Sequence, residues 1–360
     1  MRVRKSTATL LLVWLGGLAL AYVARAVLPQ RYYIDARIIE AVIDNPLSEW
    51  EWSPSFQHTA IAWQLLGFGT LWPHALAAAA GYSIAIASIA WGVRMARTPW
   101  QPAVYLLLAM WCVAVVIYHG QYSKEMFAIV VVAVILRLSG SAYGVAAAVL
   151  VALAYAAVFR SYWALIVVLW LMLLAGWRIG ISWPWRLLVV FVAILLLSAV
   201  SFKVMGFWLS DGRTIPLENR DLEVDATTVI FNPLDNTSEA TDLANSAMGW
   251  LTLILPFYLF QLGAVQYVAF ALFQLLNTTL FVLAARRAGG ASGARAPGTD
   301  SWRYAAATSW CVAFTLVQGM FEPDFGSFLK HATTLAPMLA FIFLSARFVP
   351  APLRHRTLAS

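Results

Sequence analysis

Long apolar runs alternate with short polar breaks along almost the whole chain. Because a bilayer core needs about 20 apolar residues per helix, runs of this length predict membrane spans. Counting them gives about ten spans, near 8–27, 74–93, 102–119, 123–138, 142–159, 161–177, 185–205, 265–285, 304–320 and 331–347. The expected fold class is therefore an all-α polytopic membrane helix bundle, a single integral membrane domain over residues 1–360.

Two polar segments are much longer than the other breaks, at about 28–57 and 206–247. Each is followed by a short apolar stretch, residues 59–72 after the first and 250–260 after the second. These stretches are too short to cross a bilayer comfortably, so interfacial or re-entrant helices are predicted there. If both crossed instead, the bundle would have twelve spans and the downstream topology would change.

Arginine positions predict the orientation of the bundle. With the N-terminus in the cytoplasm, every predicted inner loop carries Arg, as the positive-inside rule expects, and both termini are cytoplasmic. The two long segments and most acidic residues then face outward. The basic start, Met1–Lys5, precedes an apolar run that is long enough to be an uncleaved signal-anchor helix. The inner segment 286–303 is rich in Gly, Ala and Ser, which predicts a flexible cytoplasmic linker.

Composition excludes a soluble domain and gives no sign of a nucleic-acid partner. The chain is 62% hydrophobic and 11% charged, whereas soluble domains have about half apolar and a quarter charged residues. The net charge of +7 is scattered through short loops and forms no continuous basic patch. No nucleotide-binding, paired-cysteine or zinc-protease motif is present, so no cofactor is predicted. A divalent metal stays open, because the outer loops hold many carboxylates, although their spacing does not indicate a site.

Three polar clusters lie where predicted spans meet on the outer side. The first contains His119, Lys124 and Glu125, the second is Arg160 within residues 159–163, and the third contains Glu322, Asp324, Lys330 and His331. Ionisable groups at membrane depth are costly, and Lys and Arg normally favour the inner side. A bound anion would justify these positions, and a lipid-linked phosphate in the outer leaflet fits best. The predicted substrate-binding residues are His119, Lys124, Arg160, Tyr162 and Lys330.

Each cluster also has a simpler interpretation. Arg160 offers a planar fork that matches phosphate oxygens, but it could equally be an interfacial anchor beside Tyr162. Lys124 could extend to the headgroups. Lys330 is expected to lie with its neighbour at the start of a helix, whose amides favour anions, although the same segment reads as a solvated turn.

Transfer chemistry at this site would need a general base. Four candidates lie on the outer side, in no fixed order: Asp35, Glu322, Asp324 and His331. A carboxylate at the membrane surface could accept a proton from a sugar hydroxyl, and His331 could carry a proton near neutral pH. Asp35 could instead only solvate its loop.

The layout and three segments, 121–125, 160–163 and 325–331, resemble Wzy-type bacterial polysaccharide polymerases and the wider GT-C group of polyprenyl-phosphate-dependent membrane glycosyltransferases. The paired Arg-x(10)-Gly motifs of some polymerases and the acidic pair of many GT-C enzymes are missing, which leaves the base open. The resemblance implies transfer or polymerisation of polyprenyl-pyrophosphate-linked glycan units at the periplasmic face of the bacterial inner membrane, in O-antigen or exopolysaccharide synthesis. It also implies membrane lipids and other polysaccharide-assembly proteins as partners.

Three alternatives stay open. One is a GT-C glycosyltransferase that uses a polyprenyl-phosphate monosaccharide. Another is a transporter for a lipid-linked oligosaccharide, which would place charge deep in several spans, whereas the predicted mid-span regions carry almost none. The last is a non-catalytic subunit of an envelope complex, in which the acidic outer loops dock other proteins.

Overall fold

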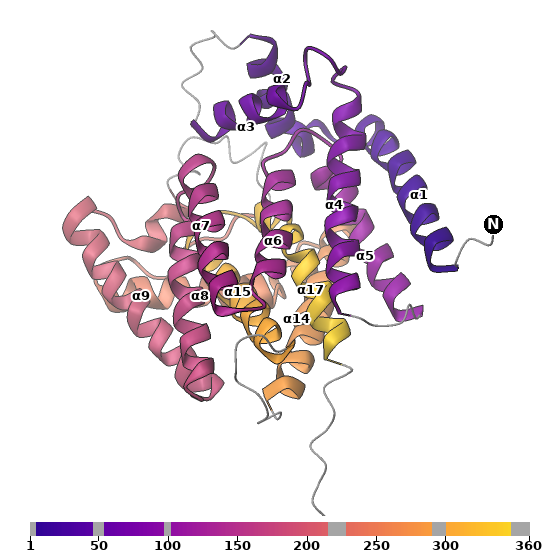
Figure 1. The fold of residues 1–360 in the computed structure, drawn as a ribbon. Coiled ribbons are helices and arrows are strands. Elements are labelled where there is room, and N and C mark those ends of the chain that lie inside the picture. The colour runs from indigo at the N-terminus through magenta and orange to yellow at the C-terminus, as the bar shows by residue number, and fades with distance from the viewer. Residues whose placement is uncertain (1–4, 46–53, 97–101, 215–227, 290–299, 347–360) are drawn as a thin grey trace, which may run out of the picture.

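The computed structural model describes residues 5–45, 54–96, 102–214, 228–289 and 300–346, and these ranges fold into helices without any β-strand (Figure 1). Both termini, residues 215–227 of the second outer segment and residues 290–299 of the predicted linker lie outside the described residues. The ends of the predicted linker 286–303 are helical, because the flanking helices extend to Gly289 and begin at Asp300.

Every predicted span coincides with helical structure. The helices are α1 (Lys5–Val27), α4 (Leu76–Met95), α5 (Pro102–His119), α6 (Glu125–Leu138), α7 (Ala142–Val158), α8 (Trp163–Arg178), α9 (Trp183–Met205), α14 (Val265–Gly289), α15 (Asp300–Phe321), α16 (Phe325–Ala332), the 3-10 turn η3 (Thr333–Leu335) and α17 (Ala336–Ser345). Within the described residues, four segments are long and apolar enough to cross a membrane: Leu76–Met95, Trp183–Met205, Val265–Arg286 and Phe325–Ser345. The chain is thus a helical bundle with the character of a membrane protein.

The last predicted span is a broken helix. α17 carries Pro337 in its first turn, where the missing N–H interrupts the hydrogen-bond ladder. Lys330 and His331 lie in the last turn of α16, so their predicted position at a helix start is wrong. The reason is local: the Asp324 side chain accepts a 2.7 Å hydrogen bond from the Ser327 amide and begins the helix earlier.

The described part of the first outer segment, predicted as a loop over 28–57, is largely helical, and residues 46–53 lie outside the described residues. It contains the 3-10 turn η1 (Gln30–Tyr33), α2 (Ile34–Asp44) and α3 (Pro54–Leu65). α2 buries Ala36, Ile39 and Ile43 at helical spacing against Trp63 of α3, which gives this pair its own small core. Figure 1 shows α2 and α3 together over one end of the bundle. The predicted short helix at 59–72 ends at Leu65.

The second outer segment, predicted over 206–247, contains the 3-10 turn η2 (Leu209–Arg213) and the beginning of α12 (Glu239–Ile254). α12 packs along α15 and α9, so the apolar stretch predicted at 250–260 is the end of a longer helix, followed by the short α13 (Tyr258–Gln261). Pro256 lies at the break between α12 and α13.

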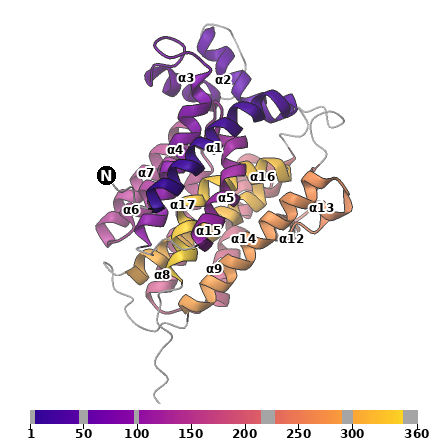
Figure 2. The same cartoon turned by 90° about the vertical axis from the view of Figure 1, so that its right-hand side faces the viewer.

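The centre of the bundle is α15, which packs between α8, α12 and α17, while α17 packs on α4 (Figures 1 and 2). Large aromatic side chains fill the contact between α8 and α15, among them the fully buried Trp170 and Trp310, whose rings meet edge to face at 5.1 Å. The outer polar residues lie around this layer, at the end of α5, at the start of α6, in the connection between α7 and α8, and between the end of α15 and the end of α16.

Candidate functional site

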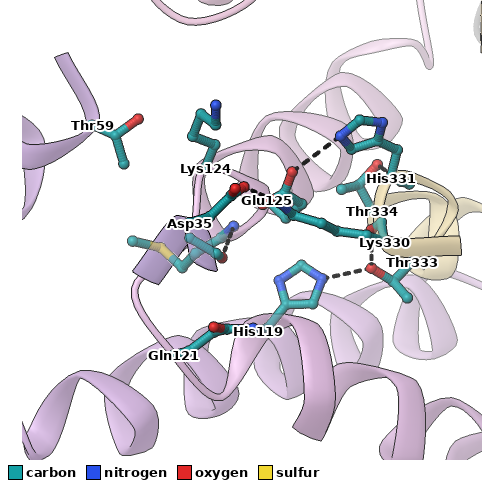
Figure 3. A network of polar contacts seen from close by, with 12 residues as sticks. Asp35, Thr59, His119, Gln121, Lys124, Glu125, Lys330, His331, Thr333 and Thr334 are labelled. Atoms are coloured by element: carbon teal, nitrogen blue, oxygen red, sulfur yellow. Dashed lines mark hydrogen bonds and ion pairs between the residues drawn. The ribbon is translucent and has the colours of Figure 1, made fainter. Parts of the chain in front are cut away.

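Three polar segments meet around one buried carboxylate, Glu125. Glu125 begins α6, and only 1% of its side chain is exposed. Arg160, from the connection between α7 and α8, forms an ion pair with its Oε1. Nζ of Lys330 lies 3.7 Å from its Oε2, and Nε2 of His331 lies 3.3 Å from its Oε1. Arg160 and Lys330 therefore meet at one carboxylate from positions far apart in the chain. Figure 3 shows Glu125 between Lys124, Lys330 and His331.

Lys124 completes the cation cluster from the α3 side. Its Nζ lies 3.4 Å from the Ser55 hydroxyl and 3.5 Å from the centroid of the Phe56 ring. Burial lowers the pKa of Lys124 to about 8, and the charges of Arg160 and Lys330 act in the same direction, while Asp35 acts against them. Lys124 is therefore the member of the cluster whose charge is most easily lost.

Asp35, on α2, forms an ion pair with Lys330 across 295 positions of sequence. Burial raises the pKa of Asp35, but the ammonium groups of Lys330 and Lys124 lower it more, so it lies below its usual range. Two of the three cations are already paired with carboxylates, Arg160 with Glu125, and Lys330 with Asp35 and Glu125. An anion that binds Lys330 in place of Asp35 must therefore displace that carboxylate.

His331 links Glu322 to Arg160. Its Nδ1 faces two acceptors, Oε1 of Glu322 and, at 3.1 Å, Oε1 of Gln318, so Nδ1 carries a proton. Its Nε2 contacts Nη1 of Arg160 and lies 3.3 Å from Oε1 of Glu125.

Three further predicted residues support this centre. His119 is fully buried, and its Nε2 donates to the Thr333 hydroxyl at 2.9 Å, which in turn donates to the Lys330 carbonyl at 2.6 Å. The Tyr162 hydroxyl accepts a 2.7 Å hydrogen bond from Nη1 of Arg160. Asp324 caps α16. These contacts give each of them a structural role beside the cations.

A cavity of about 430 Å³ opens next to the cluster, in the size range of small-molecule sites. Asp35, Asp324 and Lys330 are the predicted site residues that line it. Its other walls are largely aromatic, with contributions from Tyr32, Phe56, Tyr118, Tyr122, Tyr267 and Phe325. Lys124, Arg160, His331 and Glu322 do not line the cavity, so Lys330 is the one predicted cation that faces it in the described part of the chain.

Glu125 is the residue that the sequence left without a role. Its only signal is a carboxylate beside Lys124 at the top of an apolar helix, and spacing does not show that it pairs with Arg160 and Lys330 instead. In the described parts of the chain, no group of three or more His, Cys, Asp or Glu side chains is arranged to hold a metal ion.

Comparisons with known proteins assign the chain to no family. No family model matches it, and neither a curated protein nor a solved structure does.

Proposed function

We propose that this protein is a membrane glycosyltransferase that transfers or polymerises polyprenyl-pyrophosphate-linked glycan units at the periplasmic face of the bacterial inner membrane. The convergence of Lys124, Arg160 and Lys330 around Glu125 carries the proposal. A departing pyrophosphate develops negative charge, which preorganised cations stabilise. In this proposal all ten predicted spans cross the membrane, in a GT-C-like arrangement.

The cavity beside Lys330 suits a sugar. Its walls combine aromatic rings, which stack on the apolar faces of sugars, with polar groups that orient hydroxyls. Asp35 lies on the same wall as Lys330, so the phosphate and the reacting hydroxyl would bind side by side.

An apolar groove suits the lipid. It has a volume of about 520 Å³ and is lined by α14, α15 and α17 residues such as Phe281, Val312 and Leu339. Phe328 and Ala332 of α16 line its wall, and the same helix carries Lys330. A polyprenyl chain in this groove would place its phosphorylated end at the cation cluster.

Asp35 is the best-placed general base of the four candidates. The positive charge of Lys330 lowers the pKa of Asp35, and burial raises it. A phosphate bound to Lys330 would offset that positive charge, so the pKa of Asp35 would rise. The acceptor hydroxyl oxygen then attacks the anomeric carbon and its proton passes to Asp35. The bond from that carbon to the pyrophosphate oxygen breaks, and the pyrophosphate leaves with the electron pair toward Lys330. Substrate binding itself thus produces the base.

The test is elongation by the purified protein, supplied with a lipid-linked repeat unit and no nucleotide sugar. We expect glycans longer than one unit from the wild type. Arg160→Lys keeps the charge but loses the fork, and should lose the product at normal protein level. Arg137→Lys, at the opposite end of α6, is the matched control. Only single-unit material from folded wild-type protein would refute the proposal, and full activity of Arg160→Lys would show that the planar fork of Arg160 is not needed for transfer.

A further inference from the structure

Arg213 is a buried cation outside the site described above. It ends η2 in the second outer segment, and 1% of the residue is exposed. Its Nη2 donates to the Gly319 carbonyl of α15, while Nε and Nη1 have no hydrogen-bond partner within the described residues. Such a group is costly to bury, so its position requires an explanation.

The Gly319 carbonyl belongs to the last turn of α15, which ends at Phe321. The last four carbonyls of a helix lack partners within the helix, and positive charge is favourable there. Arg213 therefore caps the C-terminal end of α15 from a segment more than 100 residues away in sequence.

The packing around this contact leaves no space for a side chain at position 249 of α12, which is a glycine. A Cβ atom at Gly249 of α12 would lie 2.0 Å from Nη2 of Arg213 and 2.5 Å from the Gly319 carbonyl oxygen. Burial lowers the pKa of Arg213 to about 10, and the carboxylates of Glu322 and Asp242 act against this. Asp242 is itself buried, and its Oδ1 accepts a 2.8 Å hydrogen bond from the Ser210 amide.

The capped end of α15 carries the groups that hold His331. Gln318 and Glu322 both contact Nδ1 of His331, and Glu125 faces its other nitrogen. Nη1 of Arg160 also contacts Nε2 of His331. A continuous set of contacts therefore leads from Arg213 through the end of α15 to His331 and the cation cluster.

We propose that Arg213 is a positioning residue, which fixes the end of α15 so that Glu322 holds His331 and His331 in turn orients the Arg160 fork. Arg213 touches neither the cavity nor the apolar groove, so its effect on transfer passes through these contacts. The consequence for catalysis rests on the proposed function, whereas the contacts do not.

The direct test is the Nδ1 proton resonance of His331 in the membrane-embedded protein, measured by NMR with ¹⁵N-labelled histidine and assigned by its loss in His331→Gln. A proton shared with Glu322 resonates at low field. We expect this resonance to shift upfield partially in Arg213→Lys, which keeps the charge but not the geometry, and to disappear in Arg213→Met. Arg186→Gln, which removes another buried arginine on α9, should leave it unchanged.

Elongation kinetics complete the test. Arg213→Lys should lower kcat with little change in KM for the lipid-linked unit, because substrate contacts persist while the orientation of Arg160 suffers. An unchanged Nδ1 resonance in whichever Arg213 variant folds would overturn the proposal. Absence of transfer by the wild type would instead refute the proposed function and leave the resonance readable.

Discussion

Replacing Asp35 by Asn should separate binding from catalysis. The ion pair between Asp35 and Lys330 must open before an anion can reach Lys330, and the two side chains are 29% and 18% exposed. A charge-assisted hydrogen bond of this kind contributes about 1.5–3 kcal/mol. Since 1.4 kcal/mol is tenfold in affinity, Asp35→Asn should bind inorganic pyrophosphate about 10- to 100-fold more tightly. The same variant should lose glycan transfer, because it removes the base.

Isothermal titration of the detergent-solubilised protein with inorganic pyrophosphate measures the first effect, and elongation of the lipid-linked unit measures the second. Glu40→Gln is the control, since Glu40 lies on the same helix, is 28% exposed and pairs with Arg25, away from the cluster. It should leave both measurements unchanged. Equal or weaker pyrophosphate binding by Asp35→Asn would contradict the idea that Asp35 occupies the position of the ligand.

Three other predictions concern charge, stability and the groove. Lys124 has a pKa of about 8, so pyrophosphate affinity should weaken between pH 7 and 9 as its charge is lost, and Lys124→Met should flatten that part of the profile. The pKa of Lys124 is lower in the folded protein than in the unfolded chain. The folded protein should therefore gain stability as pH rises from about 8 toward the ordinary pKa of a lysine. Glu125→Gln should reduce the free energy of unfolding by about 3–5 kcal/mol, because it leaves buried cations unpaired; a loss no larger than that of Glu40→Gln in thermal melts would count against the convergence. Val282→Trp should block the apolar groove and raise KM for the lipid-linked unit, whereas Leu283→Trp, which is similarly exposed on α14 but does not line the groove, should not. Equal KM values for the two variants would contradict a role of the groove in lipid binding.

The sequence was sufficient to locate helices at the ten predicted spans but not α12, whose first part lies in the segment predicted as an outer loop. Apolar runs of spanning length have to become helices, since no other element satisfies its own backbone in lipid. Boundaries shifted where local capping intervened, as at Asp324, which starts α16 six residues before Lys330 and so moved the Lys-His pair to the helix end. The two outer segments were predicted as loops because their apolar positions recur over only a few turns, as in α2.

Most polar residues that meet at the candidate site stand out in the sequence, but the central role of Glu125 and the pairing of these residues do not. Arg160 and Lys330 lie at membrane depth, where ionisable groups are costly, and this indicates an anion site. The periodicity of the sequence does not show which carboxylates they contact. Glu125 joins partners 35 and 205 positions away in sequence, and Asp35 meets Lys330 across 295. The sequence does not indicate the role of Arg213, because its contact with the Gly319 carbonyl forms only when η2 packs against the end of α15.

The central claim is that the cation cluster binds the pyrophosphate of a lipid-linked glycan. Electron cryo-microscopy of the protein in nanodiscs with a lipid-linked repeat unit tests it most directly. The account predicts phosphate density beside Lys330 and the Arg160 fork, with Asp35 no longer paired to Lys330 and the glycan in the aromatic cavity. A headgroup bound elsewhere, with the Asp35–Lys330 pair intact, would contradict it.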